Sequence, residues 1–500
     1  MLMKNKRLSD LLSGINAIKK TGSNDREITS LVYDSREVEN GSLFFALKGI
    51  HTDGHKYINQ VIESGAVVII HSDDLEEYRD DVDYVKVEDC RKAMSPISSA
   101  YFDFPSKKLK IIGVTGTDGK STTVSMIHQL LELCGKEAGF ISTVNYKTGN
   151  NTAKSPIRQS TPEAPTIHKL LAEMIHNGKE YAVVESTSHG LSDKTSRLKD
   201  VDFNGAVLTN VTHEHLEFHG TIEQYRNDKA NLFRMAGDFA IINFDDENHR
   251  LFEDAADSCK KISYSTMNKD CNLYAYNAVS DSKGTNFDLL YNSGKYSIRL
   301  NVPGLINVEN IMASLAAVHE VSKVSIREII NVIPDVQSVK GRMALIKGSQ
   351  PFDVYVDYAH TPGSYKKVFP LFRKAAAKRL ITLFGSGGER DREKRPVQGE
   401  IADLYSDIII LTDEDPRLED SMSIIEDIAK GIKNKTRNKD LFLIRDRTAA
   451  ITKAIEIAEP GDMVISLGKG HESSIECADG HHPWDEISVV ESVLHKMGYK

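Results

Sequence analysis

The stretch IIGVTGTDGKSTT, residues 111–123, joins a short apolar run to a loop rich in glycine and threonine. Val124, Ile127 and Leu131 follow at helical spacing, so the stretch predicts a strand, a tight loop and a helix. Glycines let backbone N–H groups approach an anion, and the N-terminus of a helix favours negative charge. The stretch therefore predicts a phosphate-binding loop at the end of a strand in an α/β sheet.

The spacing of this loop differs from that of the common P-loop of motors and switches. The pattern GxxxxGK[ST] would place a glycine where this chain has Val114. Lys120 supplies a positive charge for phosphate groups, and the hydroxyl of Ser121 or Thr122 is placed to reach a magnesium ion. We expect Asp118 to face outward as a helix cap or turn residue. Phosphate binding is favoured over the alternative, a glycine-rich turn without a ligand.

Composition limits the classes of protein that need to be considered. The chain has 500 residues, 40% of them hydrophobic and 27% charged, which predicts a globular protein of several domains. Its net charge of −9 argues against a nucleic-acid binder. Five scattered cysteines without a CxxC pair predict neither a disulfide framework nor a structural zinc site. No signal peptide or long apolar run is evident, so we expect a cytoplasmic protein without membrane insertion.

Strand-like runs alternate with helical patterns along most of the chain, which predicts an α/β fold with largely parallel sheets. The clearest runs are 66–70, 110–116, 181–186, 205–210, 239–244, 352–358, 380–385, 407–413 and 462–468. Several end in polar residues or glycine, and ligands of parallel sheets bind beyond the carboxyl ends of the strands. Proline, glycine and basic residues interrupt the pattern near 102–110 and 338–354. We therefore predict three domains, residues 1–107, 108–339 and 340–500.

Two segments beside the loop carry a family resemblance. They are ESTSHGLSDKTSRL (185–198) and TNVTHEHLEFHGTIEQYRNDKANLF (209–233). With the loop, they closely resemble the central ATPase domain of the Mur ligases, ATP-dependent enzymes that form amide bonds in the peptidoglycan precursor. The segments at 33–58, 385–396 (GSGGERDREKRP) and 468–472 (GKGHE) resemble the members that add the third, usually diamino, residue. The resemblance covers nearly the whole chain and implies an N-terminal uridine-binding domain, a central P-loop ATPase domain and a C-terminal Rossmann-like domain.

The resemblance also implies a reaction. ATP phosphorylates the D-Glu γ-carboxylate of UDP-N-acetylmuramoyl-L-alanyl-D-glutamate, and the amine of a free diamino acid attacks the acyl phosphate. Cations are needed where the two anionic reactants meet. Lys120 and three further residues are implied as catalytic: Glu185 and His215 as Mg²⁺ ligands with Ser121, and Lys229 as a lysine carbamylated by carbon dioxide that faces the metal. His213 and His219 lie close by in the sequence, so one of the three histidines could be purely structural.

The same resemblance assigns binding residues for each substrate. For ATP they are Gly116, Thr117, Asp118, Gly119, Lys120, Ser121, Thr122, Asn307, Arg342, Asp357 and His360. For the UDP-sugar they are Ser35, His51, Ser160, Thr161, Thr187 and Arg197. The segment before Arg197 is two residues longer than is usual in the family, which makes Asp193 and Thr195 doubtful contacts. For the amino acid they are Arg390, Asp415, Arg417, Gly468 and Glu472. Asn310 follows Asn307 at helical spacing and is interpreted as a capping or packing residue. We expect a monomer.

The identity of the added amino acid depends on one short motif. Members that use meso-diaminopimelate usually carry DNPR, whereas this chain has Asp415-Pro416-Arg417 after Glu414. An aspartate in place of the amide suits an extra ammonium better than an extra carboxylate, which favours L-lysine or L-ornithine over meso-diaminopimelate. Arg417 suits the α-carboxylate shared by all of these amino acids.

Rival functions fit the sequence less well. A MurF-type ligase, a cyanophycin synthetase or a folylpolyglutamate synthetase would not explain the uridine-type segment or GGERDREKRP. A P-loop kinase would not explain the outer domains. A catalytically inactive nucleotide-gated regulator predicts loss of Lys120, Glu185, His215 or Lys229, and all four are present.

Overall fold

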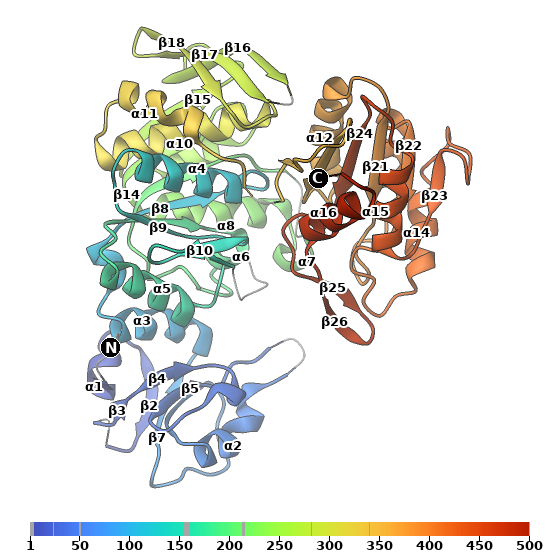
Figure 1. Ribbon diagram of the computed structural model, residues 1–500. Coiled ribbons are helices and arrows are strands. Elements are labelled where there is room, and N and C mark those ends of the chain that lie inside the picture. The colour runs from blue at the N-terminus through green and yellow to red at the C-terminus, as the bar shows by residue number, and fades with distance from the viewer. Residues whose placement is uncertain are drawn as a thin grey trace. The chain divides into compact units, whose positions relative to one another are not determined.

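The computed structural model describes three α/β sheets with helices on both faces (Figure 1). This architecture confirms the α/β prediction. The described residues are 5–23, 25–49, 52–154, 161–212, 216–281, 283–339 and 341–499. Contacts within the chain define two compact units, the first with residues 1–274, 290–294 and 309–332, the second with residues 275–289, 295–308 and 333–500. The domain boundaries at 107 and 339 stay a prediction.

The N-terminal sheet has the strand order β2-β7-β6-β5-β4. The β2–β7 pair is antiparallel and the other pairs are parallel. One face packs on α1 and α3 and the other on α2, each through apolar side chains. The bounds are β2 (Ala17–Thr21), β4 (Ser30–Val32), β5 (Ser42–Phe45), β6 (Ala66–His71), β7 (Asp83–Val87), α1 (Leu8–Leu11), α2 (Ile58–Glu63) and α3 (Cys90–Tyr101). A separate short pair joins β1 (Lys6–Arg7) to β3 (Glu27–Ile28).

The central sheet has eleven strands in the order β11-β10-β9-β12-β8-β13-β14-β15-β16-β17-β18. The strands from β9 to β16 are all parallel. The predicted runs at 110–116, 181–186, 205–210 and 239–244 correspond to β8 (Lys110–Thr115), β12 (Tyr181–Glu185), β13 (Phe203–Leu208) and β14 (Ala236–Asn243). The other strands are β9 (Ala138–Ile141), β10 (Asn145–Lys147), β11 (Ala153–Lys154), β15 (Lys260–Ser265), β16 (Leu273–Asp281), β17 (Gly284–Tyr291) and β18 (Gly294–Leu300).

Helices cover both faces of the parallel part of this sheet (Figure 1). On one face, α5 (Ala164–His176), α8 (Ile222–Met235) and α9 (His249–Ala255) pack on the strands through a single large apolar cluster. On the other face lie α4 (Lys120–Leu133), α10 (Ile306–Ser322) and α11 (Ile326–Val332). Two short helices, α6 (Ser188–Leu191) and α7 (Leu216–His219), follow β12 and β13. Burial of the sheet on both faces is typical of parallel strands.

The register of the central strands brings the predicted polar ends together. Glu185 pairs with Val114, and Leu208 pairs with Thr115, so β8, β12 and β13 end at one edge of the sheet. Val114 itself is fully buried within β8. A glycine is therefore not needed there, because the phosphate loop (residues 116–119) begins only after this strand has ended.

The C-terminal sheet has six strands in the order β19-β20-β24-β21-β22-β23, all parallel except the β19–β20 pair. Helices α12, α13 and α14 cover one face, and α15 and α16 cover the other. The bounds are β19 (Ala344–Leu345), β20 (Asp353–Asp357), β21 (Leu380–Phe384), β22 (Ile408–Leu411), β23 (Leu441–Leu443), β24 (Met463–Leu467), α12 (Pro362–Ala375), α13 (Lys394–Tyr405), α14 (Ser421–Ala429), α15 (Arg447–Glu456) and α16 (Glu486–Lys496). A hairpin of β25 (Ser474–Cys477) and β26 (Gly480–Pro483) lies outside this sheet.

Two further expectations can be compared with the structure. All five cysteines are free thiols. Among the described residues, no helix is both long and apolar enough to span a bilayer.

Candidate functional site

The phosphate loop is fixed by the two residues that follow β13. The backbone N–H of Thr117 donates to the carbonyl of Asn210 (2.6 Å), and the Thr209 hydroxyl donates to the carbonyl of Asp118 (2.6 Å). Gly116 has φ +147°, and a Cβ added there would lie 1.9 Å from Thr209 Oγ1. Glycine is thus required at position 116, because the neighbouring strand end occupies the space that a side chain would need.

The structure excludes one of the two predicted roles of Asp118. Helix α4 begins at Lys120 and its N-cap residue is Gly119, with φ +82°. The helix-cap role is therefore wrong, because Asp118 lies one residue too early. The N–H of Asp118 donates to Asn210 Oδ1 (3.2 Å) while its carbonyl accepts from Thr209, so its backbone joins the loop to the end of β13. The turn role stays a prediction.

The two lysines predicted for catalysis both reach this loop. The Lys120 ammonium donates to the carbonyls of Gly116 (3.1 Å) and Thr117 (2.7 Å). Lys229 extends from α8, is only 2% exposed, and donates to the same Gly116 carbonyl (2.6 Å). Its ammonium also lies 4.4 Å from the centre of the Tyr225 ring. The fold thus places two positive charges against the loop from opposite sides of the sheet.

The carboxylate of Glu185 lies beside the first turn of α4. It is 2% exposed and accepts hydrogen bonds from the Ser121 hydroxyl (2.9 Å) and from the N–H and hydroxyl of Thr143 (3.0 and 2.9 Å). Two of the predicted Mg²⁺ ligands, Ser121 and Glu185, are therefore adjacent. A carboxylate and a hydroxyl are hard oxygen ligands, which fit Mg²⁺. Thr122 lies in the same helical turn.

Of the three clustered histidines, only His219 lies within the described residues. Its Nδ1 lies 2.7 Å from Asp228 Oδ2 and its Nε2 lies 3.1 Å from the Ser188 hydroxyl, and the ring is buried. Both ring nitrogens therefore have partners, and His219 links α6, α7 and α8. His213 and His215, the latter a predicted metal ligand, lie outside the described residues.

Three residues predicted for the UDP-sugar meet next to Glu185. The Thr161 hydroxyl donates to the Glu185 carbonyl (3.0 Å) and lies 2.9 Å from the Thr187 hydroxyl. Arg197 donates to the Thr161 carbonyl (3.0 Å) and to Glu163 Oε1 (2.8 Å). The Arg197 guanidinium is thus held at the strand edge by a carboxylate of the chain itself.

The other predicted contacts of the UDP-sugar are placed as follows. Ser35 begins a short 3₁₀ helix, Ser35–Glu37, whose N-cap is Asp34. The extra residues before Arg197 form a turn in which Ser196 has φ +51° and Asp193 is exposed. His51 and Ser160 lie outside the described residues.

The ATP residues predicted in the second unit gather around Tyr358. The Arg342 guanidinium lies 4.5 Å from the centre of the Tyr358 ring, and the His360 ring lies 4.8 Å from it. Asp357, at the end of β20, accepts from the backbone N–H groups of Met343 and Ala359 (2.7 Å each). Arg342, Asp357 and His360 are therefore neighbours in the second unit, and their role in ATP binding stays a prediction.

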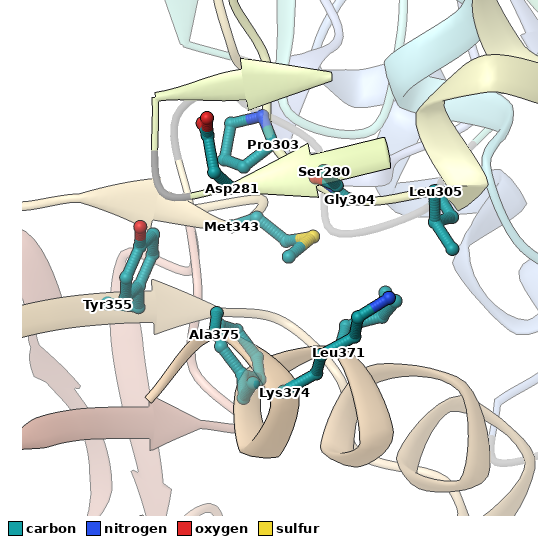
Figure 2. A pocket seen from close by; sticks show the side chains of 11 residues that line it. Ser280, Asp281, Pro303, Gly304, Leu305, Met343, Tyr355, Leu371, Lys374 and Ala375 are labelled. Carbon is teal, nitrogen blue, oxygen red and sulfur yellow. The ribbon is translucent and has the colours of Figure 1, made fainter. Parts of the chain in front are cut away.

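Asn307 lies in the first turn of α10, and its side chain donates to the carbonyl of Pro303 (2.7 Å). A small cavity adjoins this turn (Figure 2), lined by Ser280, Asp281, Pro303, Gly304, Leu305, Met343, Tyr355, Leu371, Phe372, Lys374 and Ala375. Its volume is about 30 Å³, which is room for water rather than for a nucleotide base. Neither Asn307 nor Arg342 lines it, so we do not assign this cavity to the adenine.

Apart from Arg390, the residues predicted for the amino acid lie in the segments that follow β22 and β24. Lys469, fully buried, donates to Asp415 Oδ1 (2.8 Å) and also to Glu472. Burial raises the pKa of Glu472, and Lys469 only partly offsets this. Burial lowers the pKa of Lys469, but Glu472 and Asp415 outweigh it, so that its pKa is raised. Asp415 is thus already paired with an internal ammonium, which the sequence did not predict.

The remaining residues of this group differ in their surroundings. Gly468 has φ +101°, and a Cβ there would lie 2.6 Å from Glu414 Oε2. The backbone N–H of Arg417 donates to the carbonyl of Glu476 (2.9 Å), and its φ is +54°. Arg390 is exposed in the segment after β21. The structure therefore groups Asp415, Glu472 and Gly468 closely, with Arg417 two residues along the same loop.

Sequence reasoning missed several residues that organise these sites. Thr143 donates twice to Glu185, and Glu163 holds Arg197. The side chain of Asn310, interpreted as a capping or packing residue, accepts from the Thr123 hydroxyl (3.3 Å) behind the phosphate loop. Lys469 lies within the GKGHE segment, so that motif could have identified it. No sequence motif marks Thr143 or Glu163, because each is one ordinary polar residue in a loop.

Comparisons with known proteins agree with this geometry. Three family models match the chain: Mur ligase family, catalytic domain (27–102); Mur ligase middle domain (114–318); and Mur ligase, glutamate ligase domain (341–470). The UDP-N-acetylmuramyl-tripeptide synthetase of Borreliella afzelii is 48% identical over 499 residues, 98% of each chain. The UDP-N-acetylmuramoyl-L-alanyl-D-glutamate–2,6-diaminopimelate ligase of Clostridium botulinum is 37% identical, covering 95% of this chain and 96% of the other.

The solved structures show the same relationship. A UDP-N-acetylmuramoyl-L-alanyl-D-glutamate–2,6-diaminopimelate ligase aligns with a TM-score of 0.68 and 27% identity, over 99% of this chain and 100% of the other. A MurF from Acinetobacter baumannii aligns with a TM-score of 0.69 at 20% identity, and this alignment shows a shared fold. Full-length coverage, matched domains and the grouped site residues lead to one conclusion. The chain belongs to the Mur ligase family, whose members are ATP-dependent amide ligases.

Proposed function

We propose that this ligase adds a free diamino acid to the D-Glu γ-carboxylate of UDP-N-acetylmuramoyl-L-alanyl-D-glutamate in peptidoglycan precursor synthesis. The observation that carries the proposal is the convergence of Lys120, Lys229, Ser121 and Glu185 on one end of the parallel sheet. Relatives named as tripeptide synthetases at 46–48% identity support the same substrate.

The first step is transfer of the ATP γ-phosphoryl group to the γ-carboxylate, which gives an acyl phosphate and ADP. Loop N–H groups and the Lys120 ammonium hold the phosphates, and electrostatic stabilisation of this kind is the main means of phosphoryl-transfer catalysis. Ser121 and Glu185, together with His215, would hold Mg²⁺, which would supply positive charge to neutralise the phosphates. After its ammonium releases a proton, the neutral amine of Lys229 would add to carbon dioxide and release a second proton, which gives an anionic carbamate, a further oxygen ligand.

In the second step the amine attacks the acyl carbon, the tetrahedral intermediate collapses, and inorganic phosphate leaves. Oriented donors stabilise charge as it develops at the reacting carbonyl. Arg197 is linked to Glu185 by two hydrogen bonds through Thr161, which supports a role for Arg197 in binding an anionic part of the UDP-sugar peptide. Asn307, Arg342, Asp357 and His360 are proposed to hold the nucleoside part of ATP.

We favour L-lysine or L-ornithine as the added residue, with meso-diaminopimelate as the alternative. The group holds one buried ammonium, Lys469, and two partly exposed carboxylates, Asp415 and Glu472. Asp415 Oδ2 has no hydrogen-bond partner among the described residues. An excess of carboxylates suits a second ammonium better than a second carboxylate, and Arg417 suits the α-carboxylate.

The decisive experiment is an assay of phosphate release from ATP with the UDP-dipeptide and a panel of amino acids. The panel is L-lysine, L-ornithine, meso-diaminopimelate and, as a control, L-alanine. We expect turnover with a diamino acid and none with L-alanine. Absence of turnover with every diamino acid would contradict the proposed reaction, whereas preferential use of meso-diaminopimelate would contradict only the assignment of the amino acid.

A further inference from the structure

The hairpin of β25 and β26 carries an unusual set of side chains at its tip. Its register pairs Ile475 with His482 and Cys477 with Gly480, and residues 478 and 479 form the connection. Because side chains alternate along each strand, Cys477 and His482 lie on the same face of the hairpin. Asp479, in the turn, completes a set of thiol, imidazole and carboxylate.

These three side chains converge. Cys477 Sγ, one carboxylate oxygen of Asp479 and one ring nitrogen of His482 all lie within 4.8 Å of one another. His482 Nε2 lies 2.8 Å from Asp479 Oδ1. Cys477 is half-buried, whereas the other two are exposed. The opposite face carries a separate ion pair between Glu476 and His481, so the two histidines of the hairpin serve different faces.

We propose that Cys477, Asp479 and His482 form a binding site for a thiophilic divalent cation, with Zn²⁺ as the best fit. Zinc takes Cys sulfur at about 2.3 Å, His nitrogen at about 2.0 Å and carboxylate oxygen at about 2.1 Å, in tetrahedral geometry. Ligand atoms around such an ion lie roughly 3–4 Å apart, so rotation of exposed side chains suffices to close the site. Water takes the fourth position, and the Cys477 thiol releases its proton to solvent on binding.

The chemistry separates this site from the magnesium site proposed beside Glu185. A thiolate is a soft ligand that selects zinc-like ions, whereas Mg²⁺ is held by oxygen ligands. The proposal therefore does not depend on the ligase reaction. A second group of possible metal ligands among the described residues consists of Asp53, His55 and Asp73. Both ring nitrogens of His55 already have partners there: one lies 2.7 Å from Asp53 Oδ1, and the other accepts from the N–H of Ser72 (3.1 Å). This group makes a poorer site than the hairpin.

The hairpin also connects the metal site to the loop of Asp415 and Arg417. The N–H of Glu476 donates to Asp415 Oδ1 (2.9 Å), and the carbonyl of Glu476 accepts from the N–H of Arg417 (2.9 Å). Glu476 directly precedes Cys477, so a metal bound at the tip restrains the strand that makes both of these contacts.

The test is a titration of the tag-free, full-length, reduced protein with Co²⁺, which reports tetrahedral geometry and thiolate ligation in its absorption spectrum. We expect one equivalent to give a thiolate-to-cobalt charge-transfer band, displaced by Zn²⁺. Cys477→Ser should lose the band, and His482→Ala and Asp479→Asn should weaken Zn²⁺ binding by about tenfold or more. Circular dichroism spectra identical to wild type establish that the variants are folded.

Two control variants define the site. Cys134→Ser removes a thiol elsewhere in the chain, and His481→Ala removes the histidine on the opposite face of the hairpin; both should keep the band and the Zn²⁺ affinity. A wild-type protein without a thiolate band would overturn the proposal. A band that survives in Cys477→Ser, or a loss in His481→Ala equal to that in His482→Ala, would overturn it as well.

Discussion

Replacement of Lys469 by methionine tests how much the buried charge group contributes to stability. Lys469 is fully buried and donates to both Asp415 and Glu472. Methionine fills similar space but has no charge, so two neighbouring carboxylates would be left without their shared cation. Removal of one partner from a buried ion pair costs about 3–5 kcal/mol. The side chains of Asp415 and Glu472 are 14% and 31% exposed, so water partly screens their charges. We therefore expect the free energy of unfolding at pH 7 to fall by about 3 kcal/mol, the lower end of that range.

The pH dependence of this loss follows from Glu472. Burial holds the pKa of Glu472 above its ordinary value, and Lys469 opposes that rise. Without Lys469 the pKa of Glu472 in the folded protein rises further. Such a carboxyl group has a higher pKa in the folded than in the unfolded protein. It does not lower the free energy of unfolding at pH values below its pKa in the unfolded protein, about 4.3. The loss of unfolding free energy then grows as the pH rises through the pKa of the group in the folded protein. The variant should therefore differ least from wild type near pH 4.5 and most at neutral pH.

Fluorescence of Trp484, the chain's one tryptophan, reports unfolding of the region that contains the variant. Trp484 packs against the apolar cluster beneath α15 and α16, and urea titrations at several pH values would give the unfolding free energies. The variant Lys469→Met/Glu472→Gln should recover part of the loss and much of the pH dependence. Lys430→Met, which removes a cation 69% exposed beside Asp427, should cost less than about 1 kcal/mol. A loss below about 1 kcal/mol in Lys469→Met, or one independent of pH, would refute this reasoning.

Three further predictions concern the ligase site. Gly116→Ala should weaken binding of an ATP analogue by about tenfold or more, since its Cβ would overlap Thr209. Gly135→Ala, with φ +72° and open space around it, should leave binding unchanged, and equal effects in both variants would contradict the steric argument. Lys229→Ala should lower turnover more than about a hundredfold, with partial rescue by short carboxylates; full activity without rescue would rule out the carbamate. Asp415→Asn should lower the ratio of lysine to diaminopimelate use, and an unchanged ratio would contradict the charge argument.

The fold could be predicted from the sequence because its main signals are local. Apolar runs of five or six residues mark the buried parallel strands, and polar residues directly after them mark the ends where ligands bind. Glu185 and Asp357 illustrate this, because each is the last residue of a strand that the sequence predicted. The phosphate loop was equally visible, because its glycines are required by backbone geometry.

The partners of the site residues could not be predicted, because they depend on contacts between distant segments. Thr143 lies 42 residues from Glu185, and Glu163 lies 34 residues from Arg197. Neither residue type is unusual in a loop, so only the folded chain identifies them. The extra strands β16, β17 and β18 were missed for a related reason: their alternating polar residues resemble a surface segment more than a buried strand.

Two of the cations proposed to meet a substrate, Lys120 and Arg197, already have internal partners, and these partners affect the free energy of substrate binding. Lys120 holds two loop carbonyls, while Arg197 holds one carboxylate and one carbonyl. An ammonium has three donors and a guanidinium five, so a phosphate or carboxylate can be added without the loss of every existing contact. The internal partners also hold each side chain in one geometry before the substrate arrives, which lowers the entropic cost of binding. A variant that removes such a partner, Glu163→Gln for Arg197, should therefore weaken substrate binding while the cation itself is retained.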